Sequence, residues 1–306
     1  MKNYNIHNIL KVRMNIYFFP EFLESTKVGT PDLEVIEGGF QFDKNGLKPY
    51  YRFPIKFYEQ DKKVFIEFTP KKQLLKILLE DLEGHTKFYF KESMIYKPFH
   101  NVIFPAWPSI RNLIRFLLQI KFLQKGFAAI HSATLSKDGI GVMLPAWPST
   151  GKSTTCYNLA NEGFEILSDE ISIFSTSGTA YKIFESGAFT PKNLRPPFGR
   201  KKSFKFDTQK TSEKIKKLIL LKKGSPKIQK KKPEDILNVI KASTDFEFQN
   251  FFTRYVFLSY CFSNNFESNF VDKNTDKILR LALKRMKCYV VYGDRSNFHK
   301  TIRELV

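Results

Sequence analysis

The stretch from Leu144 to Thr154, which reads Leu-Pro-Ala-Trp-Pro-Ser-Thr-Gly-Lys-Ser-Thr, constrains the fold of this 306-residue chain more than any other. An apolar run at 141–144 precedes it, as expected of a buried strand. The segment 152–161 contains good helix formers, and Gly163 stands where such a helix would end. A strand, a loop and a helix in direct succession predict an α/β arrangement with the loop at the edge of a sheet.

The loop follows the spacing of the phosphate-binding pattern G-x-x-x-x-G-K-[ST], with alanine in place of the first glycine. Backbone N–H groups of such a loop, at a helix N-terminus, point at anionic phosphate. Lys152 would reach the outer phosphates of a nucleotide, and the Ser153 hydroxyl would bind the accompanying Mg²⁺. We therefore predict that ATP and Mg²⁺ are bound by Ala146, Ser149, Thr150, Gly151, Lys152, Ser153 and Thr154.

An ordinary strand-to-helix turn with an exposed lysine is the alternative to a nucleotide site. Ala146 and Pro148 count in favour of that alternative. Glycine allows the closest approach of backbone to a ligand, and proline has no N–H to donate. The sequence on either side of the loop has to decide between the two readings.

The neighbouring segments favour the nucleotide site. A second apolar run, at 164–167, is followed by Asp169 and Glu170. Two carboxylates thus stand where a strand ends, at the edge where open α/β sheets bind ligands. A further strand is predicted over 128–135, and it carries His131.

The sequence from His131 to Asp169 resembles the HPr kinase/phosphorylase family, and more closely the HPr-kinase-like proteins that are distinct from true HPr kinases. In that family a histidine opens the strand before the loop, and an acidic pair follows the next strand. The related proteins also read Leu-Pro-Ala-x-Pro before Gly-Lys-Ser-Thr, which makes Ala146 and Pro148 features of the group. The resemblance is specific over 128–175 and weaker over 191–193 and 289–293.

This resemblance implies an α/β P-loop kinase domain of the HPr kinase/PEP carboxykinase-like type over 101–306, after a small α+β domain over 1–100. It also implies an ATP-dependent kinase that phosphorylates a hydroxyl, such as that of Ser or Thr in a protein or peptide. True HPr kinases carry a downstream Glu-x-Arg-Gly-Leu-Gly-type segment associated with phosphorylase activity, and this sequence has no counterpart. HPr itself is therefore not the expected acceptor, and a small metabolite remains open. The family's tendency to assemble leaves a homo-oligomer open as well.

The resemblance also assigns roles to four residues. Asp169 would deprotonate the acceptor hydroxyl, and Glu170 would help to position the metal ion with Ser153. His131 would contact the transferred phosphate, although a hydrogen-bonded core histidine is the alternative. Lys192 is a candidate for a second phosphate-binding cation, although a solvated loop lysine is the alternative there.

Hydrophobic patterning outside this block predicts the remaining elements. The first 100 residues suggest strands at 35–36, 50–58 and 64–68 and a helix over 71–82 that ends before Gly84. The rest of the chain suggests helices over 110–125, 234–242, 246–262 and 272–286, and strands over 171–174, 180–184, 215–221 and 288–292.

The segment from Arg195 to Lys232 is strongly basic. It holds fifteen Lys or Arg against Asp207 and Glu213, and so carries most of the chain's net charge of +20. The lysines could form an ordinary solvated surface, or they could attract an acidic partner. Sparse aromatic residues argue against a platform for single-stranded nucleic acid. A nucleotide-gated binding protein or degenerate kinase with a basic face is thus the alternative to an active kinase.

Three widely spaced cysteines form no metal-binding pattern and suggest a reducing compartment. No apolar run approaches the length of a membrane span, and the N-terminus lacks a signal-peptide core. The sequence therefore predicts a cytoplasmic protein.

Overall fold

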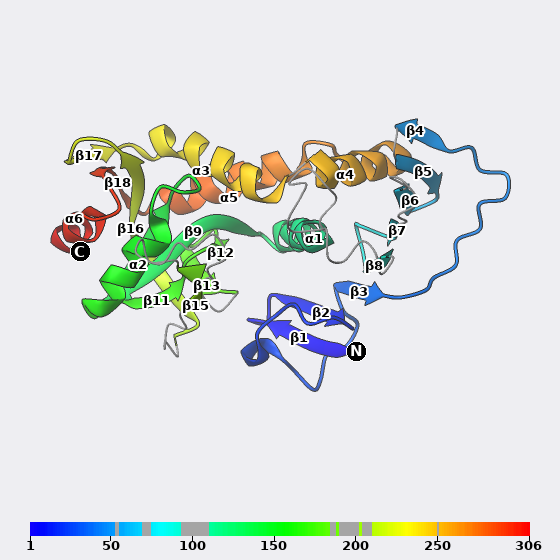
Figure 1. Cartoon of the computed structure of the whole chain (residues 1–306), viewed down its shortest axis with the longest axis horizontal. Helices are drawn as coiled ribbons and strands as arrows, with labels where there is room; N and C mark the ends of the chain where they lie inside the picture. The colour runs from blue at the N-terminus through cyan, green and yellow to red at the C-terminus, as the bar shows by residue number, and fades with distance from the viewer. Residues whose placement is uncertain are drawn as a thin grey trace. The chain divides into compact units, whose positions relative to one another are not determined.

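The computed structural model describes residues 1–52, 55–68, 75–92, 110–183, 188–189, 202–203, 210–249 and 251–306 (Figure 1). Over these residues the protein is mixed α/β, with six α-helices and two eight-stranded sheets. It divides into two compact units, the first formed by 1–121 with 248–271 and the second by 122–247 with 272–306. The domain boundary predicted at residue 100 lies outside the described residues and stays a prediction.

The first unit is built on a sheet with the strand order β1-β2-β3-β8-β7-β6-β5-β4. The strands are β1 (Lys2–Ile6), β2 (Leu10–Met14), β3 (Leu33–Glu37), β4 (Tyr50–Arg52), β5 (Ile55–Gln60), β6 (Lys63–Phe68), β7 (Leu75–Glu80) and β8 (Thr86–Glu92). Helix α1 (Ile110–Gln124) begins in this unit and α4 (Phe251–Asn264) belongs to it. The hydroxyl of Tyr260 on α4 accepts a hydrogen bond of 2.9 Å from the backbone N–H of Leu82, which ties this helix to the sheet.

The helix predicted over 71–82 is wrong, because its described part is the strand β7, paired on both sides with β6 and β8. Leu75, Ile77 and Leu79 are buried, and Leu78 packs with Tyr58 and Phe65 in a separate cluster. A strand that is covered on both faces reads as a continuous apolar run, and such a run does not distinguish a strand from a buried helix. Between residues 1 and 92, the described part of the chain contains no α-helix.

The second unit contains the other large sheet, with the order β10-β9-β12-β13-β16-β18-β17 and β11 paired with β9. Its strands are β9 (Phe127–Lys137), β10 (Ile140–Pro145), β11 (Glu165–Ser168), β12 (Ile171–Ser175), β13 (Thr179–Lys182), β16 (Ser212–Lys223), β17 (Lys227–Lys231) and β18 (Lys287–Gly293). A separate two-stranded sheet pairs β14 (Ala188–Phe189) with β15 (Lys202–Ser203). Strands β10, β16 and β18 run parallel, so their carboxyl ends lie at one edge of the sheet.

Four helices complete this part of the chain: α2 (Lys152–Asn161), α3 (Pro233–Phe248), α5 (Phe270–Leu283) and α6 (Phe298–Leu305). Both α2 and α6 contribute to one buried apolar cluster with β9, β10, β11, β16 and β18. The strands predicted at 128–135, 141–144, 164–167, 171–174, 215–221 and 288–292 are confirmed, and residues 180–182 of the strand predicted at 180–184 lie in β13. The helices predicted at 110–125, 152–161, 234–242 and 272–286 are confirmed as well.

The single aromatic helix predicted over 246–262 is wrong. Residues 246–248 end α3, while α4 begins at Phe251 and belongs to the other unit. The end of α3 and most of α4 fall within 246–262, and both are rich in apolar residues. The sequence pattern therefore does not show where one helix ends and the next begins. In the described residues, no helix is both long and apolar enough to cross a membrane.

Candidate active site

The loop at 146–151 lies at the carboxyl edge of the parallel strands. It leaves β10 at Pro145 and enters α2 at Lys152, and Ala146 forms a parallel bridge with Leu221 of β16. This is the edge at which α/β sheets bind ligands. The sequence therefore places the predicted phosphate-binding loop correctly with respect to its strand and its helix.

Alanine at position 146 has a structural reason. Ala146 is fully buried and belongs to the apolar cluster with Cys156 and Leu221. Its methyl group packs into the core instead of narrowing the mouth of the loop. The residues that need unusual backbone are Ser149, with φ of 63°, and Gly151, with φ of 123°. Glycine adopts such positive φ values without strain.

Lys152 is buried, with 8% of its surface exposed, so the alternative of an ordinary turn with an exposed lysine is wrong on that point. Its Nζ donates a hydrogen bond of 3.4 Å to the backbone oxygen of Glu170. Burial lowers the pKa of Lys152 to about 8, against the opposing influence of Cys156, Asp169 and Glu170. A cation kept partly desolvated is costly unless it acts on a ligand or a partner.

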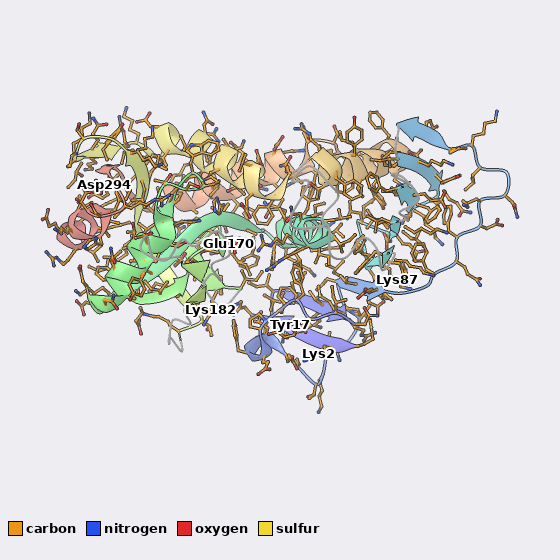
Figure 2. All side chains as sticks on the ribbon, viewed as in Figure 1. Lys2, Tyr17, Lys87, Glu170, Lys182 and Asp294 are labelled. Carbon is orange, nitrogen blue, oxygen red and sulfur yellow. The ribbon has the colours of Figure 1, made fainter. Side chains whose placement is uncertain are left out.

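Asp169 lies beside this lysine and is also buried. Burial and the neighbouring Glu170 raise the pKa of Asp169, while Lys152 and a hydrogen bond from the Ser153 side chain lower it, and the net shift is upward. A carboxylate with a raised pKa is suited to accept a proton near neutral pH. Glu170, which is labelled in Figure 2, follows directly in the sequence. It precedes β12.

His131 lies between the loop and the acidic pair within the sheet. On β9 it is paired with Ile171, the residue after Glu170, while the next residue, Ser132, is paired with Pro145 at the start of the loop. The backbone N–H of His131 donates to Thr244 Oγ1 on α3 at 3.3 Å. The register thus brings the three predicted elements, loop, histidine strand and acidic pair, side by side.

A network of buried hydroxyl groups adjoins the acidic pair, and the sequence analysis missed it. Ser172 Oγ lies 2.6 Å from both Ser168 Oγ and Thr134 Oγ1, and it donates to the backbone oxygen of Ser132 at 3.4 Å. The network fastens the turn that carries Asp169 to strand β9. The signal available in the sequence was a serine on either side of the acidic pair.

The end of α3 also contributes to the site, which the sequence analysis missed. The ring of Phe246 meets the ring of Trp147 edge to face, with centroids 6.1 Å apart. Glu247 acts electrostatically on Lys152. These residues are almost 100 positions from the loop in the sequence, so no local pattern connects them.

Arg295 approaches the loop from the carboxyl end of β18. Its Nη2 donates a hydrogen bond of 3.0 Å to the backbone oxygen of Ser149. A Cβ atom on Gly151 would lie 2.6 Å from Arg295 Cγ, so this close contact requires glycine. No local sequence pattern marks Arg295 as a site residue.

Two sequence predictions lie wholly or partly outside the described residues. Lys192 is outside them, so its role as a phosphate-binding cation stays a prediction. The basic segment is described over 202–203 and 210–232. There β17 is an edge strand with exposed Lys227 and Lys230, and Lys227 lies 4.9 Å from the ring centroid of Tyr292.

The residues present fit ATP and Mg²⁺. Ser153 lies next to Asp169, and Mg²⁺ is commonly held by one or two protein oxygens together with substrate phosphates and water. In the described part of the chain, no three His, Cys, Asp or Glu side chains are grouped so as to hold a metal ion without such phosphates.

No protein-family model matches the chain, and no curated protein matches it either. The resemblance to HPr-kinase-like proteins thus depends on the motif residues themselves.

Proposed function

We propose that the protein is a P-loop kinase of the HPr-kinase-like type, which transfers the γ-phosphate of ATP to a hydroxyl of a protein or peptide. The observation that supports the proposal most strongly is the proximity of Lys152 to Asp169 and Glu170. A buried lysine at the start of a loop-capped helix contacts the backbone of Glu170 and lies beside Asp169. Phosphoryl transfer needs positive charge to neutralise the phosphates and a group that orients the acceptor hydroxyl. Lys152 is suited to the first task and Asp169 to the second.

Each residue has a distinct part in the proposed reaction. The N–H groups of the loop and Lys152 hold the phosphates, while Ser153 and Glu170 would hold Mg²⁺, which would neutralise charge on the phosphate oxygens. Asp169 takes the proton of the acceptor hydroxyl as its oxygen bonds to the γ-phosphorus. The bond from that phosphorus to the bridging oxygen of ADP breaks, and ADP leaves. The pairing of His131 with Ile171, the residue after Glu170, supports a contact of this histidine with the transferred phosphate.

A binding protein with a basic face is the competing proposal, and the lysines of β17 favour it. The acidic pair separates the two proposals, because Asp169 is buried at a cost that a protein which only binds nucleotide has no reason to bear.

The test is transfer of label from [γ-³²P]ATP with Mg²⁺, using the purified chain alone and with extracts of its host. A kinase labels a species in the extract or the chain itself, and Asp169→Asn reduces the rate of that labelling by about 10²-fold or more. Retention of ATP binding without any labelled product supports the binding protein. Absence of ATP binding contradicts both proposals.

A further inference from the structure

Arg295 is held on a short turn whose own side chains fix its shape. The turn joins β18, which ends at Gly293, to α6, which begins at Phe298. Asp294 Oδ1 accepts hydrogen bonds from the N–H and hydroxyl of Ser296, at 2.7 and 2.5 Å. Asn297 Oδ1 accepts one from the N–H of Asp294 at 2.8 Å. Arg295 therefore extends from a pre-organised backbone, which lowers the cost of holding its side chain in place.

The side chain of Arg295 lies against the phosphate-binding loop along its length. Its stem packs where a Cβ of Gly151 would be, and its guanidinium donates to the Ser149 oxygen at 3.0 Å. Both contacted residues belong to the loop that is predicted to surround the phosphates.

The charge of Arg295 is not neutralised by any described carboxylate. A guanidinium has five N–H donors, and in the described residues the Ser149 carbonyl is the hydrogen-bond acceptor it meets. Three other described arginines are paired with carboxylates: Arg280 with Asp276, Arg303 with Glu162 and Arg13 with Glu34. An uncompensated, forked cation beside an anion-binding loop is suited to phosphate.

We infer that Arg295 is a phosphate-binding residue of this site, which contacts the phosphate chain of the nucleotide held by residues 146–153. The inference rests on the proposed nucleotide site and adds to it a cation from the turn between β18 and α6. The hydrogen bond to Ser149 holds the guanidinium at the loop, and the remaining donors are available to phosphate oxygens.

The test is a titration of the full chain with Mg²⁺-ATP, Mg²⁺-ADP and AMP, followed by the fluorescence of Trp147. The chain has two tryptophans, so a Trp107→Phe background leaves the loop tryptophan as the reporter. The variants are Arg295→Ala, Arg295→Lys and Arg295→Gln. Lys300→Ala is the matched control, because it removes one exposed positive charge from the adjoining helix α6.

We expect Arg295→Ala to weaken ATP binding by roughly tenfold to hundredfold, as for loss of a charged hydrogen bond, and Lys300→Ala to change it by less than about twofold. The loss should be largest for ATP and smallest for AMP. Arg295→Lys should retain more affinity than Arg295→Gln, because glutamine can still donate to the Ser149 oxygen but carries no charge.

Parental affinity in Arg295→Ala would overturn the inference. Equal losses in the Lys and Gln variants, the same for all three nucleotides, would also overturn it, because they would show that Arg295 only positions the loop. A thermal unfolding transition in each variant shows that it is folded. If Arg295→Ala does not fold, Arg295→Lys takes its place in the titration. If the parent binds no ATP, the proposed function fails on its own. Inorganic triphosphate then tests Arg295: binding to the parent but not to Arg295→Ala supports the inference, and no binding to the parent overturns it.

Discussion

Lys152 and the lysines of the segment 222–232, all in the second unit, differ in their exposure to solvent. Lys152 is almost completely buried beside Asp169 and Glu170, and burial brings its pKa down to about 8. The lysines of the segment 222–232, by contrast, lie mainly on the surface, around the edge strand β17. Exposed lysines retain their hydration, and on an edge strand they discourage pairing with another chain. Their abundance is thus explained by hydration alone, whereas Lys152 is buried against Asp169 and the backbone oxygen of Glu170.

The comparison shows that a high density of positive charge in the sequence does not identify the candidate active site. The segment 222–232 carries six lysines and no carboxylate, and the neighbouring Asp235 carboxylate accepts an exposed hydrogen bond from the backbone N–H of Lys232 at 3.3 Å. The group formed by Lys152, Asp169 and the hydroxyls around Ser172 has little net charge, but it is buried and connected. We call this group the polar centre. Predictions that separate the polar centre from the segment 222–232 follow, from the largest expected effect to the smallest.

Asp169→Asn should reduce phosphoryl transfer by about 10²-fold or more while ATP still binds, because the variant keeps the shape but cannot accept the proton. Initial rates of label transfer and ATP titrations at the same pH measure the two effects separately. Glu165→Gln, on the neighbouring strand β11, is a matched control whose carboxylate is paired with Lys210. Transfer at the parental rate in Asp169→Asn would mean that another group is the base.

ATP affinity should fall by about tenfold between about pH 7 and pH 9, because Lys152 has a pKa of about 8 and loses its proton over this range. An ordinary lysine, with a pKa near 10.5, would remain charged throughout. Nucleotide titrations at several pH values, at constant ionic strength and free Mg²⁺, give the profile. A flat profile would indicate that Lys152 does not lose its proton between about pH 7 and pH 9.

Ser172→Ala should lower the free energy of unfolding by about 1–3 kcal/mol, because it leaves the buried hydroxyls of Ser168 and Thr134 without their shared partner. Urea denaturation measures this change. Ser225→Ala, at an exposed position in the segment 222–232, is the control and should have almost no effect. Equal stability of the two variants would show that the hydroxyl network does not hold the acidic turn.

Replacing Lys230, Lys231 and Lys232 by Gln should leave ATP affinity within about twofold of the parent, because these charges are screened by solvent. If the segment recruits an acidic acceptor, the KM for that acceptor rises in the triple variant and rises with salt in the parent. An unchanged KM at low and high salt identifies the segment as a solvated surface. A large loss of ATP affinity in the triple variant would show that these exposed lysines, like Lys152, contribute to nucleotide binding.

The sequence predicted the local parts of the site because their signals are local. The apolar runs before Pro145 and Asp169 predicted strands, and the loop with Lys152 predicted the start of a helix. The pairing register, which places His131 between them, could not be derived from these runs. It depends on how strands far apart in the sequence are arranged.

The parts that were missed depend on tertiary contacts. Arg295 is 146 positions from Ser149, and no local sequence pattern connects the two residues. Phe246 and Glu247 were assigned to a helix of the wrong extent, so their position next to Trp147 was hidden. The error at β7 has another cause: an apolar run without alternation fits a strand covered on both faces as well as a helix.

The measurement that tests the central claim most directly is a calorimetric titration of three proteins with Mg²⁺-ATP: the parent, Lys152→Met and Lys230→Met. Methionine keeps the length of the lysine side chain and removes its charge, so the two variants differ only in which lysine is lost. The account predicts saturable binding to the parent and to Lys230→Met, and no measurable binding to a folded Lys152→Met. Equal ATP affinity in all three proteins would contradict the assignment of the loop at 146–153 as the nucleotide site.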